Sequence, residues 1–498
     1  MNPQGCTNSS DFFCSRGISD MTAADKALWL ALDQGGHGSR ALVFDAAGRK
    51  RAEAAEAVQT CRKGDRVELD ADELVRSLQS VAEAACAQLG DESRHLQGAG
   101  LATQRSNILC WRHSDDKPLS PVLSWQDRRA EKWLAGLDHQ TIREKTGLVP
   151  NPHYGASKMA WCLENLPEVQ QANEQEDLRM GPMAGYLAGR LSGSDILSDP
   201  VSASRTLLWN IHDGDWDPAL CQMFGISEKH LPLCVDSDHG FGSLILGTHR
   251  IPLNILTGDA AAALFASGQP QPETAYIVLG TGAFVQRLVE HPGAHPRLLD
   301  SILWQSKGQR MLTLEGTVNG AGSAFSWLAD THKVDENTLF ENLPQWLEDV
   351  QQAPIHQTPL FLNAVSGIGS PFWQAHAQSR FDRQATLPEQ AVAVLESVVF
   401  LLWLNMQQMA EVLPAPRSIR VSGGLSHLDG LCRKLAALSS LPVQRDQESE
   451  GSARGLGFLL SGGGSGWQSE PTVFEPEVDQ ALTQRWQNWL RFVSWAPE

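Results

Sequence analysis

The 498 residues exceed one ordinary hydrophobic core, so we expect two or three domains. A content of 42% hydrophobic and 20% charged residues, without the roughly 18–20 uninterrupted apolar residues of a membrane helix, is typical of a soluble globular protein and predicts no membrane partner. The 40 basic and 58 acidic residues give a formal net charge of −18, which disfavours nucleic acid as a partner.

The N-terminal half begins with a polar stretch. Residues 1–26 are rich in Asn, Ser and Asp and lack an apolar signal region, so we expect a disordered tail there. Two apolar runs around a glycine-rich turn predict a strand, a turn and a strand over 27–45. Apolar residues at helical spacing predict a helix over 72–89, and 97–102 reads as a short strand.

A second strand–turn–strand pattern lies at 276–289, about half a chain downstream, and indicates two related domains. A long helix is expected at 388–413 and a strand at 418–421, and the alternation of strands and helices favours an α/β fold. Glycines at 462–466 indicate a break before a last amphipathic helix. The expected boundary lies near 255–272, which gives an N-terminal domain at 27–262, a C-terminal domain at 263–466 and a helical segment at 467–498.

The common nucleotide and hydrolase motifs are absent from the sequence. It contains no GxxxxGK[ST], no GxGxxG after a strand, no GxSxG and no HExxH. The nine cysteines form no CxxC pair, which favours a reduced, cytoplasmic setting.

Three glycine turns next to polar residues remain. Asp33 precedes Gly35 and Gly36, Thr281 lies between two glycines, and Gly424 follows an expected strand. Glycine amides can approach phosphate oxygens, and a nearby carboxylate can orient hydrated magnesium. Each turn taken alone is more simply a hairpin turn.

Asp259 stands where a strand or loop enters an expected helix. On position alone, a helix N-cap is the favoured interpretation, and a general base aimed into a cleft is the alternative.

The joint order of the motifs changes this balance. Over about residues 27–466 the chain resembles the FGGY carbohydrate kinases, and the glycerol kinase branch most, through LDQGGHGSRALVFD, TQRSNILCW, SWQDRRA, SASRTLLWNIHDGDWD, TGDAAAALF, LGTGAF, LEGTVNGAGSAFSWL, VSGIGSPFW and RVSGGL. The resemblance implies two ribonuclease-H-like domains of the actin, hexokinase and Hsp70 type with an interdomain cleft. It also implies ATP and Mg²⁺, and transfer of phosphate to a hydroxyl of a small polyol or sugar.

The resemblance assigns roles to individual residues. Asp259 is the expected catalytic base, and Asp33 and Asp259 are the expected metal-associated carboxylates. The implied acceptor pocket consists of Arg105, Ser106, Trp125, His153, Asp259, Ala260 and Phe284. The implied ATP site consists of Gly35, Gly36, His37, Arg40, Gly280, Thr281, Gly322, Ser326, Gly424 and Leu428.

The chain departs from the glycerol kinase pattern at several of these positions. Gly36 and His37 replace two threonines of the first phosphate loop, while Ser326 and Leu428 replace Gln and Asn near the adenosine, which predicts relaxed base selectivity. Ser106, His153 and Ala260 replace Glu, Tyr and Gln in the acceptor pocket. Because two of these side chains are smaller and hydroxyl-binding groups are lost, we expect an acceptor larger than glycerol, such as a four- to six-carbon polyol or ketose. An acidic sugar is a secondary hypothesis.

Two other classes of protein stay open at this point. The altered first phosphate loop allows a catalytically weak family member that binds a sugar or nucleotide as a sensor or scaffold. An ATPase chaperone or actin-like filament protein shares the expected fold class but not the SWQDRRA or TQR segments. A homodimer also remains an open alternative.

Overall fold

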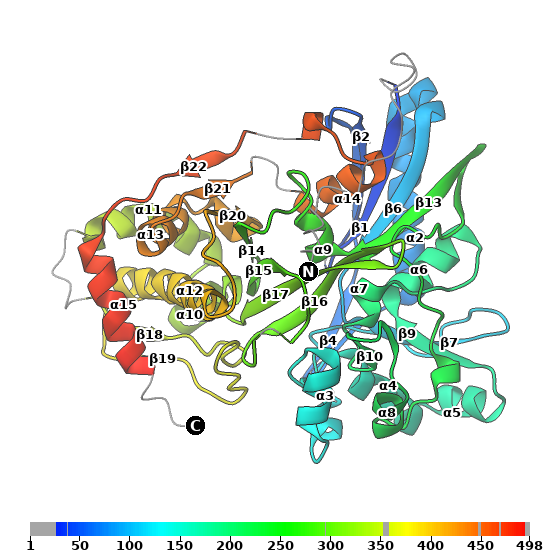
Figure 1. Ribbon diagram of the computed structural model, residues 1–498, viewed down its shortest axis with the longest axis horizontal. Coiled ribbons are helices and arrows are strands. Elements are labelled where there is room, and N and C mark those ends of the chain that lie inside the picture. The colour runs from blue at the N-terminus through cyan, green and yellow to red at the C-terminus, as the bar shows by residue number, and fades with distance from the viewer. Residues whose placement is uncertain are drawn as a thin grey trace, which may run out of the picture.

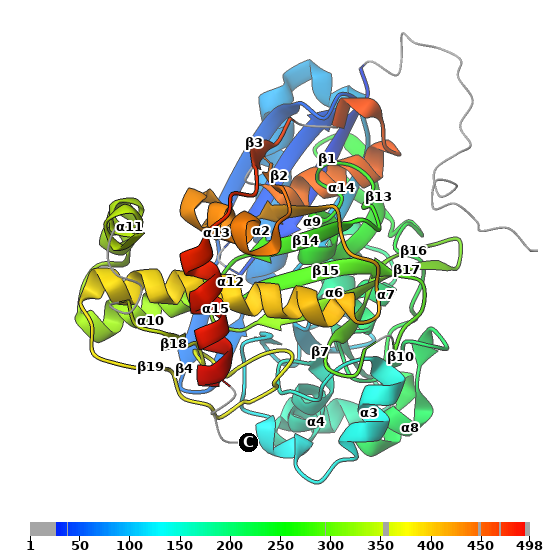
Figure 2. The ribbon, with the colours of Figure 1, turned by 60° about the vertical axis from the view of Figure 1, so that its left-hand side comes forward.

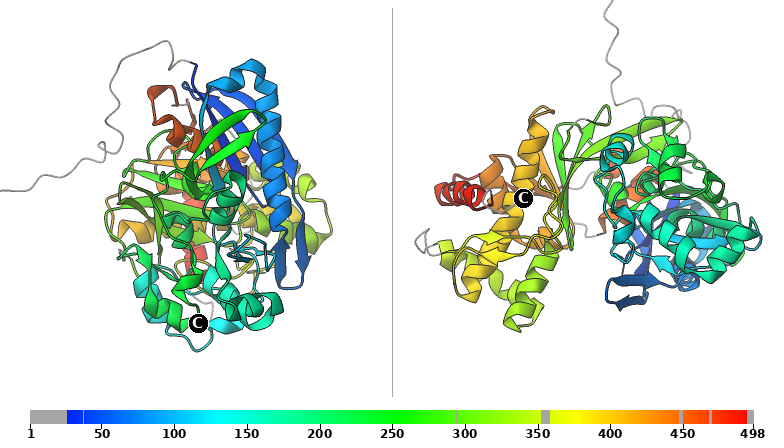
Figure 3. Two further views of the ribbon diagram at one scale, coloured as in Figure 1. Left: turned by 90° about the vertical axis from the view of Figure 1, so that its right-hand side faces the viewer. Right: turned by 90° about the horizontal axis from the view of Figure 1, so that it is seen from below.

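The computed structural model describes residues 26–36, 38–293, 295–351, 358–446, 450–467 and 470–493. The expected N-terminal tail lies outside the described residues, apart from residue 26. Two lobes, each built around a large mixed sheet, lie side by side (Figures 1 and 3).

The first large sheet has six strands in the order β12–β13–β6–β1–β2–β3. Strands β1, β2 and β3 pair antiparallel, whereas β6 runs parallel to β1 and β13 runs parallel to β6. Its strands are β1 (Leu28–Gln34), β2 (Gly38–Asp45), β3 (Lys50–Ala57), β6 (Leu96–Thr103), β12 (Ser243–Leu246) and β13 (His249–Gly258).

Both faces of this sheet are covered by other parts of the protein. Successive side chains of β1 point to opposite faces and pack in two different apolar clusters. Leu30 and Leu32 pack in one apolar cluster with the helices α2 (Ala71–Leu89) and α6 (Met183–Ser192). Ala31 points into a different cluster, which contains residues of α14 (Gly451–Ser461). The expected near-continuous apolar run of β1 is therefore a strand buried on both sides.

The second large sheet repeats this plan in the order β16–β17–β15–β14–β20–β21–β22. Strands β14, β15 and β17 pair antiparallel, and β20 and β21 follow in parallel, as β6 and β13 do in the first sheet. Its strands are β14 (Thr274–Leu279), β15 (Ala283–Val289), β16 (Leu299–Ser306), β17 (Gln309–Val318), β20 (Ser418–Ser422), β21 (Val443–Arg445) and β22 (Thr472–Phe474). The predicted α/β fold with two related domains is confirmed.

The helix α12 (Leu387–Ala410) is the centre of the second lobe. It is the one described helix that is long and apolar enough to cross a membrane by length and composition, and 72% of that window is buried inside the protein. α15 (Gln480–Val493) crosses it on the outside of the lobe (Figure 2), where Phe400 meets Trp486 and Trp489. The other helices of this lobe are α10 (Gly322–His332), α11 (Glu336–Gln351) and α13 (Asp429–Ser439).

A five-stranded sheet and several short helices lie between β3 and β13 in the chain. Its strands are β4 (Thr60–Lys63), β5 (Arg66–Leu69), β7 (Ile108–Arg112), β8 (Val122–Leu123) and β9 (Leu178–Pro182). The helices of this region are α3 (His139–Thr146), α4 (Gly155–Asn165), α5 (Pro167–Glu174), α7 (Pro200–Ala203) and α8 (Pro218–Met223). The ribbons β10–β11 (Trp209–Asn210, Asp215–Trp216) and β18–β19 (Phe361–Leu362, Arg380–Phe381) complete the strands.

The helix α14 follows β21 of the second sheet but packs on β1 and β6 of the first (Figure 1). It crosses α9 (Asp259–Ala263) so closely that a Cβ on Gly455 would lie 1.8 Å from the carbonyl oxygen of Ala262. The guanidinium of Arg454 donates to the carbonyls of Gly48, Ala266 and Trp467 at 2.8–2.9 Å. Through these contacts α14 connects the C-terminal part of the chain to the first lobe.

Candidate active site

Two carboxylates stand at one edge of the first sheet. Asp33 is the last residue but one of β1, and Asp259 directly follows β13. Both strands run parallel to β6, and Gln34 and Gly258 are both paired with Thr103, so the two carboxylates leave the sheet at the same edge. The cap position of α9 is Gly258, and Asp259 Oδ1 accepts from the amide of Ala260, the next residue along the chain, at 2.6 Å. The structure therefore does not bear out the N-cap interpretation of Asp259.

Burial perturbs both carboxylates. It raises the pKa of Asp33 to about 7; the charge of Asp259 adds to this effect, and Arg40 opposes it. Burial also raises the pKa of Asp259, against the opposing charge of Arg105. Asp33 Oδ1 is buried and has no hydrogen-bond partner among the described residues. A divalent cation fits two such carboxylates, because it would supply the missing partner and remove their mutual repulsion.

We expect Asp33→Asn to raise the stability of the protein without ligands, more at about pH 8.5 than at about pH 5.5. The folded protein holds the Asp33 proton more tightly than the unfolded chain, so its ionisation costs stability as the pH rises from about 3.8 to about 7. Asparagine removes this cost, which is about 1.4 kcal/mol per unit of pKa shift. Thermal unfolding at both pH values measures the effect. A variant that is less stable than the wild type at about pH 8.5 would contradict it.

The turn after β1 contains Gly35 and Gly36. The Gly35 amide donates to the Gly38 carbonyl at 3.0 Å, and His37 lies outside the described residues. With its amide oxygen facing the donors, Gln104 accepts from the Gly36 amide and from the Trp125 indole, both at 3.3 Å. Arg40 of β2 forms a close ion pair with Glu450, which precedes α14.

The nucleotide residues expected in the second lobe come together at the ends of β14 and β20. The amide of Gly322 donates to the Gly280 carbonyl at 2.9 Å, and the amide of Ser323 donates to the Thr281 carbonyl at 3.0 Å, so α10 begins against the turn after β14. Ser326 lies one helical turn further along α10. Gly424 opens a short 3-10 turn (Gly424–His427) after β20, and Leu428 follows it. A Cβ on Gly424 would meet nothing within 4 Å, so this backbone is open to a ligand.

The expected acceptor residues of the first lobe also lie close together. A Cβ on Gly258 would lie 2.6 Å from Arg105 Cγ, so the stem of Arg105 passes beside Asp259. The ring centroids of Trp125 and His153 are 5.2 Å apart. Burial lowers the pKa of His153 well below its usual range, and Lys158 and two arginines add to this, so the imidazole is neutral near pH 7.

Three further residues expected in the acceptor pocket are Ser106, Ala260 and Phe284. Ser106 has a φ of 66° and a buried hydroxyl without a partner among the described residues. Ala260 is the second residue of α9. Phe284 lies apart from the first-lobe residues along the chain, in β15 of the second lobe, where it pairs with Thr317.

A buried ionic cluster joins the lobes beside this pocket, and Arg105 is the only one of its members to which the sequence analysis assigned a role. Glu315 of β17 accepts from Gln286 at 2.6 Å and from Arg205, which follows α7, at 2.8 Å. Arg105 Nη2 lies 3.6 Å from the same carboxylate. Burial would raise the pKa of Glu315, but Arg205 and Arg105 outweigh it and hold this pKa at about 2. The only sequence signal was that Arg205 and Glu315 fall within the SASR and LEG segments of the family resemblance.

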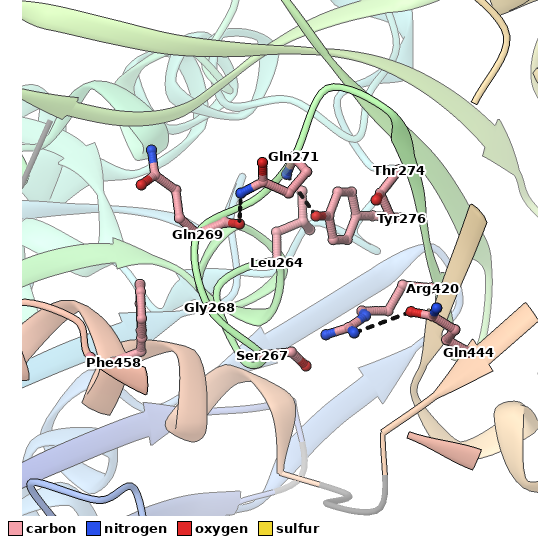
Figure 4. A pocket seen from close by; sticks show the side chains of 11 residues that line it. Leu264, Ser267, Gly268, Gln269, Gln271, Thr274, Tyr276, Arg420, Gln444 and Phe458 are labelled. Carbon is pink, nitrogen blue, oxygen red and sulfur yellow. Dashed lines mark hydrogen bonds between the residues drawn. The ribbon is translucent and has the colours of Figure 1, made fainter. Parts of the chain in front are cut away.

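A separate cavity of about 550 Å³ lies where the chain passes from one lobe to the other (Figure 4). Arg420 donates to Gln444 at 3.2 Å on one side, and the Tyr276 hydroxyl accepts from the Gln271 amide at 2.8 Å on another. None of the residues expected in the active site lines this cavity, so it is distinct from the carboxylates and glycine turns described above.

The two lobes repeat one sheet plan, with a glycine turn after β1 and after β14 and two carboxylates at the edge of the first sheet, and this is the two-domain actin- and hexokinase-like fold of the sugar kinases. The chain matches the FGGY family of carbohydrate kinases, with the N-terminal domain over residues 28–266 and the C-terminal domain over 275–459, and it belongs to this family. It is therefore a carbohydrate kinase, an enzyme that transfers a phosphoryl group to an alcohol, and the predicted family is confirmed. The filament and chaperone alternative falls away.

Relatives with curated names are similar over nearly their whole length. Glycerol kinase of Deinococcus radiodurans is 30% identical over 491 residues, which cover 92% of this chain and 95% of the relative. Glycerol kinase of Alkalilimnicola ehrlichii is 32% identical over 496 residues, which cover 93% and 97%.

Solved structures share the fold at lower identity. Plasmodium falciparum glycerol kinase with ADP superposes with a TM-score of 0.83 at 20% identity, over 95% of this chain and 98% of that chain. Gluconate kinase from Lactobacillus acidophilus superposes with a TM-score of 0.82 at 19% identity, over 94% and 98%. The predicted two-domain fold is thereby confirmed.

Proposed function

We propose that this kinase transfers the terminal phosphoryl group of ATP to a hydroxyl of a polyol or sugar larger than glycerol, with Asp259 as the general base. The observation that carries the proposal is the half-buried Asp259 carboxylate with its raised pKa, which lies beside Arg105 and near Asp33, at the sheet edge that the expected acceptor residues border. The curated relatives named above are glycerol kinases, which supports a small polyhydroxyl acceptor.

In the proposed reaction the acceptor oxygen forms a bond to the terminal phosphorus, the bond to the ADP oxygen breaks, and the hydroxyl proton passes to Asp259. Asp33 and Asp259 would hold Mg²⁺, which supplies charge neutralisation at the phosphates. The turn that contains Gly35 and Gly36, and the turn at Gly280–Gly282 against which Gly322 packs, would lie beside the phosphates, with the Thr281 hydroxyl as a donor to a phosphate oxygen. Arg105 would orient the acceptor, and Trp125 would pack against its carbon atoms.

The remaining nucleotide and acceptor assignments follow the same pattern. Ser326, Gly424 and Leu428 would border the adenosine, and Arg40 and His37 would lie near the phosphates. Ser106, His153 and Ala260 would leave more room and fewer hydroxyl-binding groups than glycerol kinases have, and Phe284 would face them from the second lobe.

We also propose a domain boundary near residues 255–272, which the family ranges 28–266 and 275–459 support. A cytoplasmic setting is proposed as well, and the seven described cysteines, none of which forms a disulfide, support it.

We expect glycerol to be a poorer acceptor than at least one four- to six-carbon polyol or ketose. The physical reason is that a site without partners for glycerol hydroxyls discriminates weakly in its favour, whereas a longer acceptor fills the added space. The kcat/KM of glycerol, erythritol, xylitol, sorbitol and the corresponding ketoses, measured by coupled ADP release, tests this order. Gluconate, paired with sorbitol, tests the sugar-acid hypothesis. Glycerol as the clearly best acceptor would contradict the proposal.

A further inference from the structure

A lysine is completely buried under the acceptor pocket. Lys158 lies in the first turn of α4, and its side chain has no exposed surface. Its Nζ donates to the carbonyl oxygens of Ser106 at 2.8 Å, Ser124 at 2.9 Å and His153 at 2.9 Å. An ammonium group has three N–H donors, so all three are used.

The three carbonyls belong to three different loops. Ser106 follows Arg105 between β6 and β7, Ser124 precedes Trp125 after β8, and His153 lies before α4. Each loop carries a residue assigned above to the acceptor pocket. All three carbonyl oxygens are backbone atoms. The ammonium therefore fixes the positions of the three loop backbones, whatever side chains the loops carry.

The cost of this arrangement argues for a specific role. A buried ammonium loses much of its hydration free energy, and a well-packed apolar side chain in its place would avoid that loss. No carboxylate forms an ion pair with Lys158 in the described part of the chain, and the nearby Asp127 is bound by Arg129 at 2.6 Å. Three charge-assisted hydrogen bonds, which are stronger than bonds between neutral groups, offset the loss.

We propose that Lys158 is a positioning residue of the acceptor site, whose ammonium holds the loops of Arg105, Trp125 and His153 in register with Asp259. This inference rests on the proposed function, because it takes these three residues as the acceptor pocket. It assigns Lys158 no contact with the acceptor itself. Its loss should therefore weaken acceptor binding and leave the nucleotide site unchanged.

Protonation of Lys158 gives this role a dependence on pH. Burial lowers the pKa of Lys158 to about 7, Asp127 and Cys162 oppose the shift, and Arg129 adds to it. His153, the other titratable side chain facing it, is neutral near pH 7. Above about pH 7 a neutral amine keeps two N–H donors for three carbonyls, so one loop loses its bond. The acceptor KM should rise over this range while the ATP KM stays constant.

The test compares Lys158→Met with Lys145→Met, a control in the same lobe. Lys145 donates to Asp217 at 2.6 Å, and among the described residues its ammonium forms no hydrogen bond or ion pair with the pocket loops. We expect Lys158→Met to raise the acceptor KM roughly tenfold or more, as the loss of about 1.4 kcal/mol of binding implies. The ATP KM should change little, and the pH dependence of the acceptor KM should disappear. Lys145→Met should lower thermal stability and leave both KM values unchanged.

The probes are glycerol and the best acceptor of the panel described above. An unchanged acceptor KM in Lys158→Met, with stability alone reduced, would overturn the inference. If Lys158→Met does not fold, Lys158→Arg and the pH profile of the wild-type acceptor KM replace it, and a flat wild-type profile then overturns the inference. A wild type that phosphorylates no acceptor refutes the proposed function instead, so the two failures are distinguishable.

Discussion

Asp259→Asn is expected to lower kcat for acceptor phosphorylation by roughly 100- to 10,000-fold, the range for loss of a general base. Asparagine keeps the shape of the side chain and can occupy the same place beside Ala260 and Arg105, but it cannot accept the hydroxyl proton. Because its charge is lost and not its volume, binding of ADP and of the acceptor should persist. Steady-state kinetics together with calorimetry of ADP binding separates the two effects.

Asp300→Asn is the matched control for this experiment. Asp300 is another aspartate whose pKa is raised by burial, to about 6, but it lies in β16 and accepts from the amide of Gly293. Its replacement should leave kcat within about twofold of the wild type. A fall in kcat of similar size in both variants would show that Asp259 acts through structure and would contradict its role as base.

The pH dependence of activity gives a second test of Asp259 as the base. A general base must be deprotonated to act, and burial raises the pKa of both Asp259 and Asp33. As the pH is lowered, activity should therefore begin to fall at a higher pH than it would if these aspartates had their ordinary pKa. The pKa of Asp33 is about 7, so protonation of this second carboxylate should add to the loss of activity below neutral pH.

Glu315→Gln should destabilise the protein by about 3–5 kcal/mol, because it leaves Arg205 and Arg105 buried without their shared counter-charge. The pKa of Glu315 in the folded protein is about 2, below its ordinary 4.5, so its stabilisation is present above pH 4.5 and is lost as the pH falls toward 2. The variant should therefore lose part of the acid dependence of unfolding. Chemical denaturation at several pH values measures this.

Glu396→Gln distinguishes the interdomain role of Glu315 from the general cost of breaking a buried pair. Glu396 of α12 is equally buried and binds Lys434 at 3.0 Å and Arg485 at 2.7 Å, all within the second lobe. Both variants should be destabilised, but only Glu315→Gln should also raise the acceptor KM, since Arg105 loses its anchor. Equal acceptor KM values in the two variants would refute a link between the cluster and the pocket.

The sequence predicted the parts of the fold that depend on local patterns. The apolar runs around the turns at Gly35 and Gly280 are β1–β2 and β14–β15, and the helical spacing near 388–413 is α12 at Leu387–Ala410. These elements could be predicted because buried strands and core helices leave a periodic signal in a short window. The five-stranded sheet was not predicted, because its strands β4, β5, β7, β8 and β9 are only two to five residues long and leave little periodic signal.

Long-range pairing explains what the sequence could not show about the site. Arg205 and Glu315 are separated by 110 positions, and nothing in either neighbourhood indicates that they meet. Lys158 reads locally as an ordinary charged residue of a helix, and only the three loops around it reveal its burial. The packing of α14 on the opposite lobe depends on the close contact at Gly455, which is equally silent in the sequence. Asp33 and Asp259 could be singled out because each lies at the end of a strand and matches a family motif.

The most direct test of the proposed function is coupled ADP release with Mg-ATP across polyols, ketoses and sugar acids, with the wild type run beside Asp259→Asn. We predict strong turnover with at least one acceptor, little turnover without it, and near-complete loss in the variant. No turnover with any acceptor, while nucleotide binding remains intact, would contradict the kinase mechanism and favour a protein that binds its sugar or nucleotide as a sensor.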